Sequence, residues 1–149
     1  MSLLVIGIAC GLALVSLGGG LYEVSVVDPC WPRRPALIQP NRGGISRKRF
    51  WIPAHVAFEA ALIAAIALSW SQPSVRTFLF VAFASHAAMR IWSALDFIPK
   101  ALAFERADPA SVTEPEARAW TRRSLLRFPL DVVTCGAMLA AFAAAARLA

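Results

Sequence analysis

The sequence predicts an all-α fold: a polytopic membrane protein whose single domain, residues 1–149, is an antiparallel bundle of four transmembrane helices. The chain has 149 residues, of which 58% are apolar and only 16% are charged, whereas a soluble domain is closer to half apolar and a quarter charged. The apolar residues gather in four long runs, and most basic residues lie between the runs. The runs show no strict alternation, which disfavours membrane-spanning strands.

We expect the four spans at roughly residues 2–22, 51–70, 75–98 and 125–147. At about 1.5 Å per residue, each run is long enough to cross a hydrocarbon core about 30 Å thick. The first run has no basic segment before it and exceeds the apolar core of a typical signal peptide, so we interpret it as an uncleaved span.

The connections between the predicted spans differ in length and charge. Residues 71–74 form a short turn, so the second and third spans make a tight hairpin. Residues 24–50 and 99–124 form long loops that carry most of the lysines and arginines. Within the second loop, SVTEPEARAW is typical of a capped helix start. That amphipathic piece either lies at the membrane interface or extends the fourth span.

Four spans place both long loops on one side of the membrane. The other side carries only Arg76 and Arg147 as basic residues. The positive-inside rule therefore puts the long loops in the cytoplasm and both termini outside, in a multi-pass protein of the cell (inner) membrane. This topology accounts for the net charge of +6. We expect no nucleic acid as a partner, because no basic helix with interleaved aromatic residues is present.

Ionisable residues lie within the predicted spans and, apart from Arg76 and Arg147 at the outer ends, all of them are in the cytoplasmic half. They form three pairs with i,i+4 spacing, which places both members on one helix face: His55–Glu59, His86–Arg90 and Arg127–Asp131. Glu23 adds a carboxylate at the end of the first span. Charges in lipid cost several kcal/mol, so we expect these side chains to turn inward and pair. The pattern predicts a polar chamber open to the cytoplasm and closed at its outer end by alanine, valine and leucine.

Some of these residues also have purely structural interpretations. Arg127 and Asp131 can satisfy each other near the interface, Asp96 fits a structural role beside Lys100, and Glu23 fits an exposed helix end. Trp51 and Trp92 lie near predicted interfaces, where any membrane protein carries aromatic residues. On the chamber side, however, Tyr22, Trp51 and Trp92 are placed to bind a flat, apolar substrate.

Four short segments resemble the small four-helix membrane proteins related to anthrone oxygenases. These segments are GGGLYE, RFWIPAH, RIWSALDFIP and AWTRRSLLR, each at the cytoplasmic end of a predicted span. The resemblance implies a four-helix bundle and, in some members, oxidation of a polycyclic aromatic ketone without an obvious cofactor. The positions that carry it are Glu23, Trp51, His55, Trp92, Trp120 and Arg127.

The residues themselves suggest a membrane-embedded enzyme for a lipophilic, cyclic or aromatic small molecule. His55 or His86 would act as general base, with Glu59 or Glu23 orienting it. Arg90 or Arg127 would stabilise a developing enolate or carboxylate. Proton abstraction beside a carbonyl serves an isomerase and an oxygenase equally, so the sequence leaves both reactions open.

The sequence also leaves three alternative functions open. His55, Glu59, His86 and Glu23 are candidate ligands of a metal, and the two histidines are candidate axial ligands of a haem. Buried histidine, glutamate and arginine also suit a proton-coupled transporter, although a chain of four helices without an inverted repeat would need to form a homo-oligomer. A structural or assembly protein needs no chamber at all.

Overall fold

The computed structural model describes residues 2–149 and shows an all-α fold with no strand among them. Four of its helices are long and apolar enough to cross a membrane, as predicted.

The first spanning helix is α1, Ser2–Tyr22, continued by the π-helical turn η1, Glu23–Val27. The second is α2, Lys48–Leu68. The third consists of α3, Pro73–Trp92, the π turn η5, Ser93–Phe97, and α4, Ile98–Arg106. The fourth consists of α5, Glu114–Ser124, the 3-10 turn η7, Leu125–Arg127, and α6, Phe128–Ala146.

Two of these helices extend well beyond the predicted spans. The third runs for 34 residues and the fourth for 33, whereas about 20 residues cross the hydrocarbon core. Much of what the sequence predicts as the loop 99–124 is therefore helical. The amphipathic segment SVTEPEARAW extends the fourth spanning helix, which was one of the two expected placements. Both helices are therefore longer than a single membrane crossing requires.

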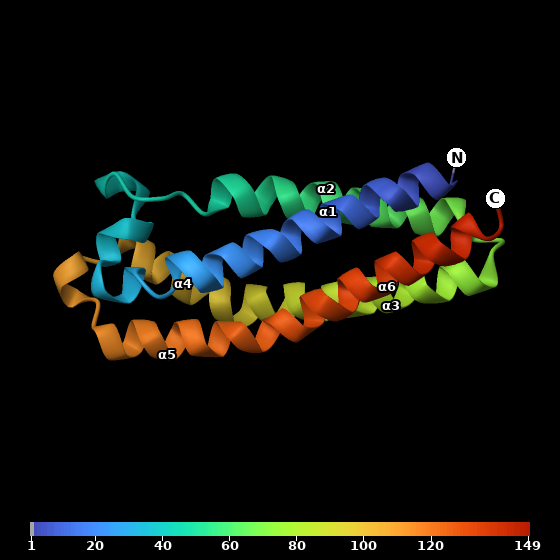
Figure 1. Cartoon of the computed structure of the whole chain (residues 1–149). Helices are drawn as coiled ribbons and strands as arrows, with labels where there is room; N and C mark the ends of the chain where they lie inside the picture. The colour runs from blue at the N-terminus through green and yellow to red at the C-terminus, as the bar shows by residue number, and fades with distance from the viewer. Residues whose placement is uncertain (1) are drawn as a thin grey trace.

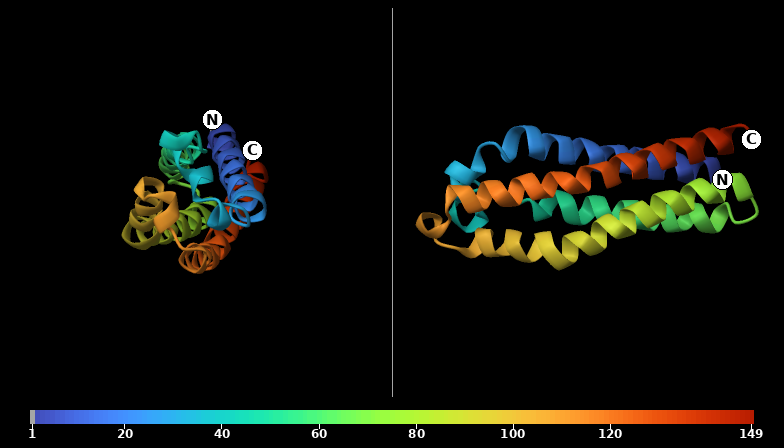
Figure 2. Two further views of the ribbon diagram at one scale, coloured as in Figure 1. Left: turned by 90° about the vertical axis from the view of Figure 1, so that its left-hand side faces the viewer. Right: turned by 90° about the horizontal axis from the view of Figure 1, so that it is seen from below.

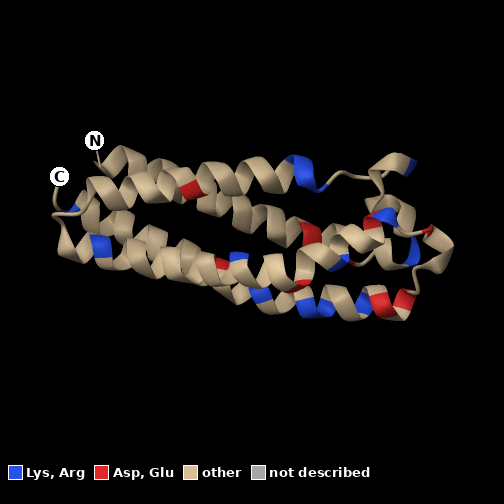
Figure 3. Cartoon of the chain, turned by 180° about the vertical axis from the view of Figure 1, so that it is seen from behind, with Lys and Arg blue, Asp and Glu red and all other residues tan. Residues whose placement is uncertain are grey.

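The four helices lie side by side, with both chain termini and the turn between α2 and α3 at one end (Figure 1). The loops 28–47 and 107–113 lie at the opposite end, and most charged residues lie in that half of the chain (Figure 3). We call these the terminal end and the loop end. Helix α6 packs against α3 and α1, and α1 packs against α2, while α2 touches α3 only sparsely. Figure 2 shows this arrangement from the loop end and from below.

The apolar core fills the terminal half of the bundle. Its buried members come from all four helices and include Ile6, Phe58, Leu79 and Met138, each 0–1% exposed. Small alanines separate these larger side chains and let the helices approach closely. The core closes the terminal half, as the uncharged outer half of the sequence predicts.

A second, smaller core closes the loop end. Trp31 lies in the short 3-10 helix η2, Trp31–Arg33, and its ring centroid is 5.3 Å from that of Phe104 and 5.8 Å from that of Trp120. The buried amide of Gln39 donates hydrogen bonds to the carbonyls of Phe104, at 2.8 Å, and Ala107, at 3.0 Å. The first loop is therefore anchored on α4 and α5 rather than extended into solvent.

The winding changes in three of the four spanning helices: the π turn η1 ends the first, the π turn η5 interrupts the third, and the 3-10 turn η7 interrupts the fourth. Pro99 and Pro129 follow η5 and η7, and each lacks the N–H that would bond to the carbonyl four residues earlier. Turns of π or 3-10 type inside α-helices often occur at functional sites or hinges. The changed winding coincides with the layer of ionisable residues.

Candidate functional site

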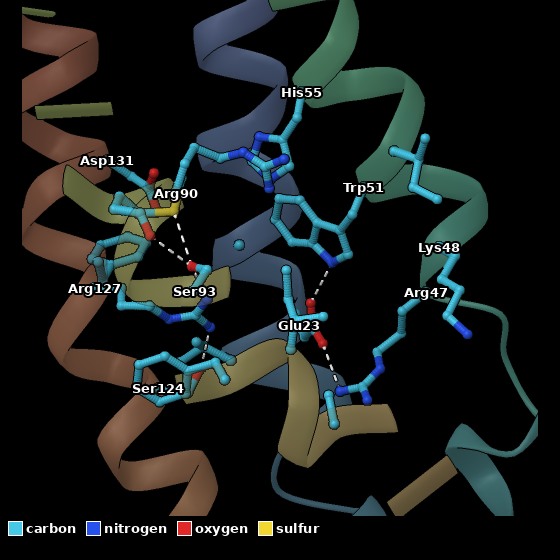
Figure 4. Close-up of a pocket in the computed structure, with 18 of the residues that line it drawn as sticks. Glu23, Arg47, Lys48, Trp51, His55, Arg90, Ser93, Ser124, Arg127 and Asp131 are labelled. Carbon is cyan, nitrogen blue, oxygen red and sulfur yellow. Dashed lines mark hydrogen bonds and ion pairs between the residues drawn. The ribbon is translucent and has the colours of Figure 1, made fainter. Parts of the chain in front are cut away.

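A cavity of about 400 Å³ lies between the two cores and is lined by all four spanning helices. Figure 4 shows part of its lining. On α2 the lining residues fall within 48–56 and the core residues within 58–65. On the other three spanning helices, too, the lining residues lie nearer the loop end than the core residues. The volume falls in the range of small-molecule pockets. Of the residues predicted for the site, the cavity lining includes Glu23, Trp51, His55, Arg90, Arg127 and Asp131.

Glu23 holds the aromatic wall of the cavity in place. It lies in the first turn of η1, and its Oε2 accepts a hydrogen bond of 2.7 Å from the indole Nε1 of Trp51. Its Oε1 accepts a second hydrogen bond, of 3.3 Å, from Nη1 of Arg47. Glu23 is therefore not an exposed helix end, because both carboxylate oxygens bind side chains at the start of α2 (Figure 4).

His55 lies one turn beyond Trp51 on α2 and stacks on its ring. The two ring centroids are 5.3 Å apart, and the ring planes differ by 20°. The His55 side chain is buried, and its Nδ1 has no hydrogen-bond partner. One ring nitrogen of a neutral imidazole is always an acceptor. His55 therefore keeps one ring nitrogen, Nδ1, to which no other side chain is hydrogen-bonded.

Arg127 reaches across the loop-end half of the cavity. Its Nη1 donates to Ser93 Oγ at 2.7 Å, its Nη2 donates to Ser124 Oγ at 2.6 Å, and its guanidinium carbon lies 4.2 Å from the Phe97 ring centroid. Its buried Nε has no hydrogen-bond partner. The expectation that Arg127 and Asp131 satisfy each other is wrong, because no ion pair joins them within residues 2–149.

The ionisable residues of α2 and α3 pair between helices rather than within them. Oε1 of Glu59 lies 3.2 Å from Nε2 of His86 and accepts a hydrogen bond of 2.9 Å from Nε of Arg90. The i,i+4 spacing placed the members of each pair on one face, but their partners are on the neighbouring helix. Glu59 and His86 lie outside the lining of the cavity, whereas Arg90 belongs to it.

The remaining predicted residues lie elsewhere. Tyr22 is 60% exposed and Trp92 packs against Phe97, and the cavity lining includes neither Tyr22 nor Trp92. Asp96 has the expected structural role but pairs with Arg123 rather than lying beside Lys100, which pairs with Glu116.

The metal hypothesis receives no support from the arrangement of its candidate ligands. No group of three or more His, Cys, Asp or Glu side chains that could hold a metal ion occurs within residues 2–149. His55 and His86 have ring centroids 5.6 Å apart, but Nε2 of His86 faces Glu59, and Phe58 packs edge-on against its ring. Glu23 binds Trp51 and Arg47 instead.

Sequence reasoning missed several residues of the cavity because it assigned them to loops. Lys48 Nζ lies 2.9 Å from Oε2 of Glu105, and Nη2 of Arg47 lies 3.6 Å from Oε1 of the same residue. These contacts join the start of α2 to the end of α4. Trp120, which the sequence singled out only through the family resemblance, is buried against the cavity with its Nε1 unpartnered. A helical interpretation of residues 99–105 would have placed Glu105 in the third spanning helix.

Asp28 is a further carboxylate of the cavity, in the loop just after η1. Burial raises the pKa of Asp28 from 3.8 to about 6, and the nearby charge of Glu23 also raises it. A hydrogen bond of 3.0 Å from the indole of Trp31, together with the charges of Arg47 and Arg127, acts in the opposite direction. Asp28 therefore titrates near neutral pH at the loop end of the cavity.

Comparison of the chain with family models, with curated protein sequences and with solved structures returns no match.

Proposed function

We propose that the protein is a membrane-embedded enzyme that moves a proton on a lipophilic carbonyl compound, with His55 as the general base. The observation that carries this proposal is the free imidazole of His55 inside a cavity of about 400 Å³, stacked on a Trp51 ring that Glu23 holds in place. A general base must be held in a productive orientation beside its substrate. His55 lines the cavity and its ring stacks on Trp51, whereas His86 is occupied by Glu59.

The proposed step breaks a C–H bond beside the substrate carbonyl. The proton moves to the free ring nitrogen of His55, and the electron pair moves to the carbonyl oxygen, which becomes an enolate. The unpartnered Nε of Arg127 and Nε1 of Trp120 are buried donors on the cavity lining, suited to bind that oxygen. Such donors contribute most where water is excluded. Return of the proton to a different carbon completes an isomerase reaction. With dioxygen as co-reactant, addition of O2 to the deprotonated CH2 carbon followed by loss of water, CH2 + O2 → C=O + H2O, would complete an oxygenase reaction.

The shape of the bundle supports a one-sided pocket over a transport path. The apolar core that includes Ile6, Phe58, Leu79 and Met138 closes the terminal half, so no polar route leads from the cavity to the terminal end within residues 2–149. We place the loop end in the cytoplasm, because it carries most of the lysines and arginines. The substrate would then be handled at the cytoplasmic side of the cell membrane.

The proposal is tested by proton exchange in heavy water. Purified protein in lipid nanodiscs is incubated with a panel of lipophilic cyclic and aromatic ketones, and deuterium uptake beside the carbonyl is measured by mass spectrometry. We expect catalysed exchange on at least one member, reduced about 10²- to 10⁴-fold by His55→Asn, which is the typical contribution of a general base. His86→Asn serves as the matched control and should retain exchange in the folded protein.

Two results would contradict the proposal. Exchange that survives in folded His55→Asn would show that this side chain is not the base. Absence of exchange across the panel in the unmodified protein would remove the reaction class. Oxygen consumption with the exchanging ketone separates the oxygenase from the isomerase reaction.

A further inference from the structure

The cavity has a mouth along one stripe of α2. Among its lining residues, those that are also exposed are Lys48, Ile52, Val56 and Ile98. The first three follow one another at i,i+4 spacing, so they lie on one face of α2 over two turns. Ile52 is 59% exposed, Val56 is 60% exposed, and Ile98 of α4 is 41% exposed. A residue that both lines a cavity and is exposed marks its rim, so the rim is apolar beyond Lys48.

Two ion pairs frame this mouth. At the loop end, Nζ of Lys48 lies 2.9 Å from Oε2 of Glu105. At the other end, Nε of Arg90 lies 2.9 Å from Oε1 of Glu59. Each pair joins α2 to the helix formed by α3, η5 and α4, and between the pairs these two helices touch only sparsely. The pairs are 11 positions apart on α2, which corresponds to about 16 Å at 1.5 Å per residue. We call this opening the α2 window.

The α2 window opens sideways, toward lipid. It starts at Lys48, the first residue of a spanning helix of 21 residues, and continues inward along Ile52 and Val56. A helix of that length matches the hydrocarbon core, so its first turns lie at the cytoplasmic interface of the bilayer. A window that is basic at the interface and apolar below it suits a molecule with one polar end and one apolar body.

The charges of the cavity lining favour a ligand whose polar end is neutral. Four carboxylates and four cations line the cavity: Glu23, Asp28, Glu105 and Asp131, with Arg47, Lys48, Arg90 and Arg127. The opposing charges balance, so the lining has no net positive charge to attract an anion. The donors without a partner, Nε of Arg127 and Nε1 of Trp120, require only an acceptor such as a carbonyl oxygen.

We infer that a neutral, carbonyl-bearing lipophile reaches the cavity directly from the bilayer, through the α2 window. This inference rests on the proposed function for the identity of the site, and it specifies the substrate class and the route. The polar end passes the interface beside Lys48 and meets the free donors inside. The apolar body passes between Val56 and Ile98 without crossing water.

The route is tested by photolabelling of the full chain in phosphatidylcholine nanodiscs, with a medium-chain alkyl ketone that bears a diazirine. Met89 lines the cavity and is 4% exposed, so a label on Met89 reports the interior. Leu95 is 78% exposed and reports the surrounding lipid. Val56→Trp fills the window. Ile63→Trp is the matched control, because Ile63 is 59% exposed, lies two turns further along the same face of α2, and lines no part of the cavity.

We expect Val56→Trp to reduce the label on Met89 at least fivefold while the label on Leu95 stays constant. Ile63→Trp should change neither. If Val56→Trp does not fold, Ile98→Trp fills the window from the opposite helix and has the same expected result. A Met89 label that either folded window variant leaves intact, or no label on Met89 in the unmodified protein, would overturn the inference.

The two experiments distinguish a failure of this inference from a failure of the proposed function. Window-dependent labelling without proton exchange would keep the route and reject the reaction. Exchange through His55 that is insensitive to Val56→Trp would keep the reaction and reject the route.

Discussion

The indole of Trp51 donates a hydrogen bond of 2.7 Å to Glu23, and the same ring stacks on His55 with 5.3 Å between centroids. A carboxylate on the first spanning helix thereby fixes a histidine on the second through one intervening ring. Glu23 acts as a positioning residue, because it contacts Trp51 rather than the imidazole. The geometry of the proposed base therefore depends on a charge that His55 does not touch.

Changing Glu23 should affect catalysis in a graded way. Glu23→Gln keeps an acceptor for the Trp51 indole but loses the charge that binds Arg47, whereas Glu23→Ala removes both interactions. A hydrogen bond to a charged group contributes about 1.5–3 kcal/mol. We expect Glu23→Ala to lower kcat roughly tenfold to a hundredfold with KM little changed, and Glu23→Gln to recover most of the loss. Equal kcat values for Glu23→Ala and the unmodified protein would show that the Trp51 and His55 rings need no support from Glu23.

Catalysis should be sensitive even to a conservative replacement of Arg127. Arg127→Lys keeps the positive charge but cannot bind Ser93 and Ser124 together while presenting a third N–H to the cavity. We expect kcat/KM for the exchanging ketone to fall at least tenfold. The matched control is Arg123→Lys, because Arg123 is 54% exposed and pairs with Asp96 outside the cavity. Similar losses in both variants would indicate a general effect of arginine on folding.

The Glu59–Arg90 pair should stabilise the bundle by joining two helices that otherwise touch only sparsely. Both side chains are more than a third exposed, and polar contacts between membrane helices contribute about 0.6–1.7 kcal/mol. A double-mutant cycle with Glu59→Gln and Arg90→Gln, followed by reversible unfolding in mixed micelles, should give a coupling free energy in that range. A coupling near zero would mean that the pair adds no stability at this end of the α2 window.

The stability of the folded protein should depend on the protonation of Asp28. Its pKa is about 6 in the folded chain, against an ordinary value of 3.8. The folded state binds the proton more tightly, so stability is present below pH 3.8 and is lost as pH rises through about 6. The upper bound is about 3 kcal/mol, at 1.36 kcal/mol per pKa unit.

Comparison with Asp28→Asn isolates this effect from the titration of other groups. The unmodified protein should melt at a higher temperature at pH 5 than at pH 7, relative to the variant measured in the same micelles. Asp28→Asn should also be the more stable protein at pH 7, because an uncharged amide can still accept from the Trp31 indole. Parallel pH profiles for the two proteins would contradict the assignment.

The sequence was sufficient for the number of spanning helices and for the layer of ionisable residues, because both follow from local hydrophobicity. It was not sufficient for the extension of the third and fourth helices through α4 and α5, since charged residues such as Glu105 and Arg118 lower the hydropathy of segments that are nevertheless helical. The sequence also left the pairing partners open. The i,i+4 rule reports which residues share a face, but the partner of Glu59 is decided by which helix α2 faces.

The distinction between the two histidines could not be drawn from the sequence either. Both lie in apolar spans near other charges. Only the packing shows that Glu59 and Phe58 surround His86, while His55 stacks on Trp51 and keeps its nitrogens free. The difference arises from contacts between helices, which spacing along one helix does not record.

The central claim is that His55 meets the ligand inside the cavity, and the chain contains only two histidines. Nitrogen-15 NMR of untagged, histidine-labelled protein in nanodiscs therefore reports on His55 and His86 alone, with His55→Asn assigning the signals. On addition of the ketone that exchanges most rapidly, we expect the ring-nitrogen signals of His55 to shift while those of His86 stay in place. A shift confined to His86, or no shift of His55 at saturating ketone, would contradict the claim.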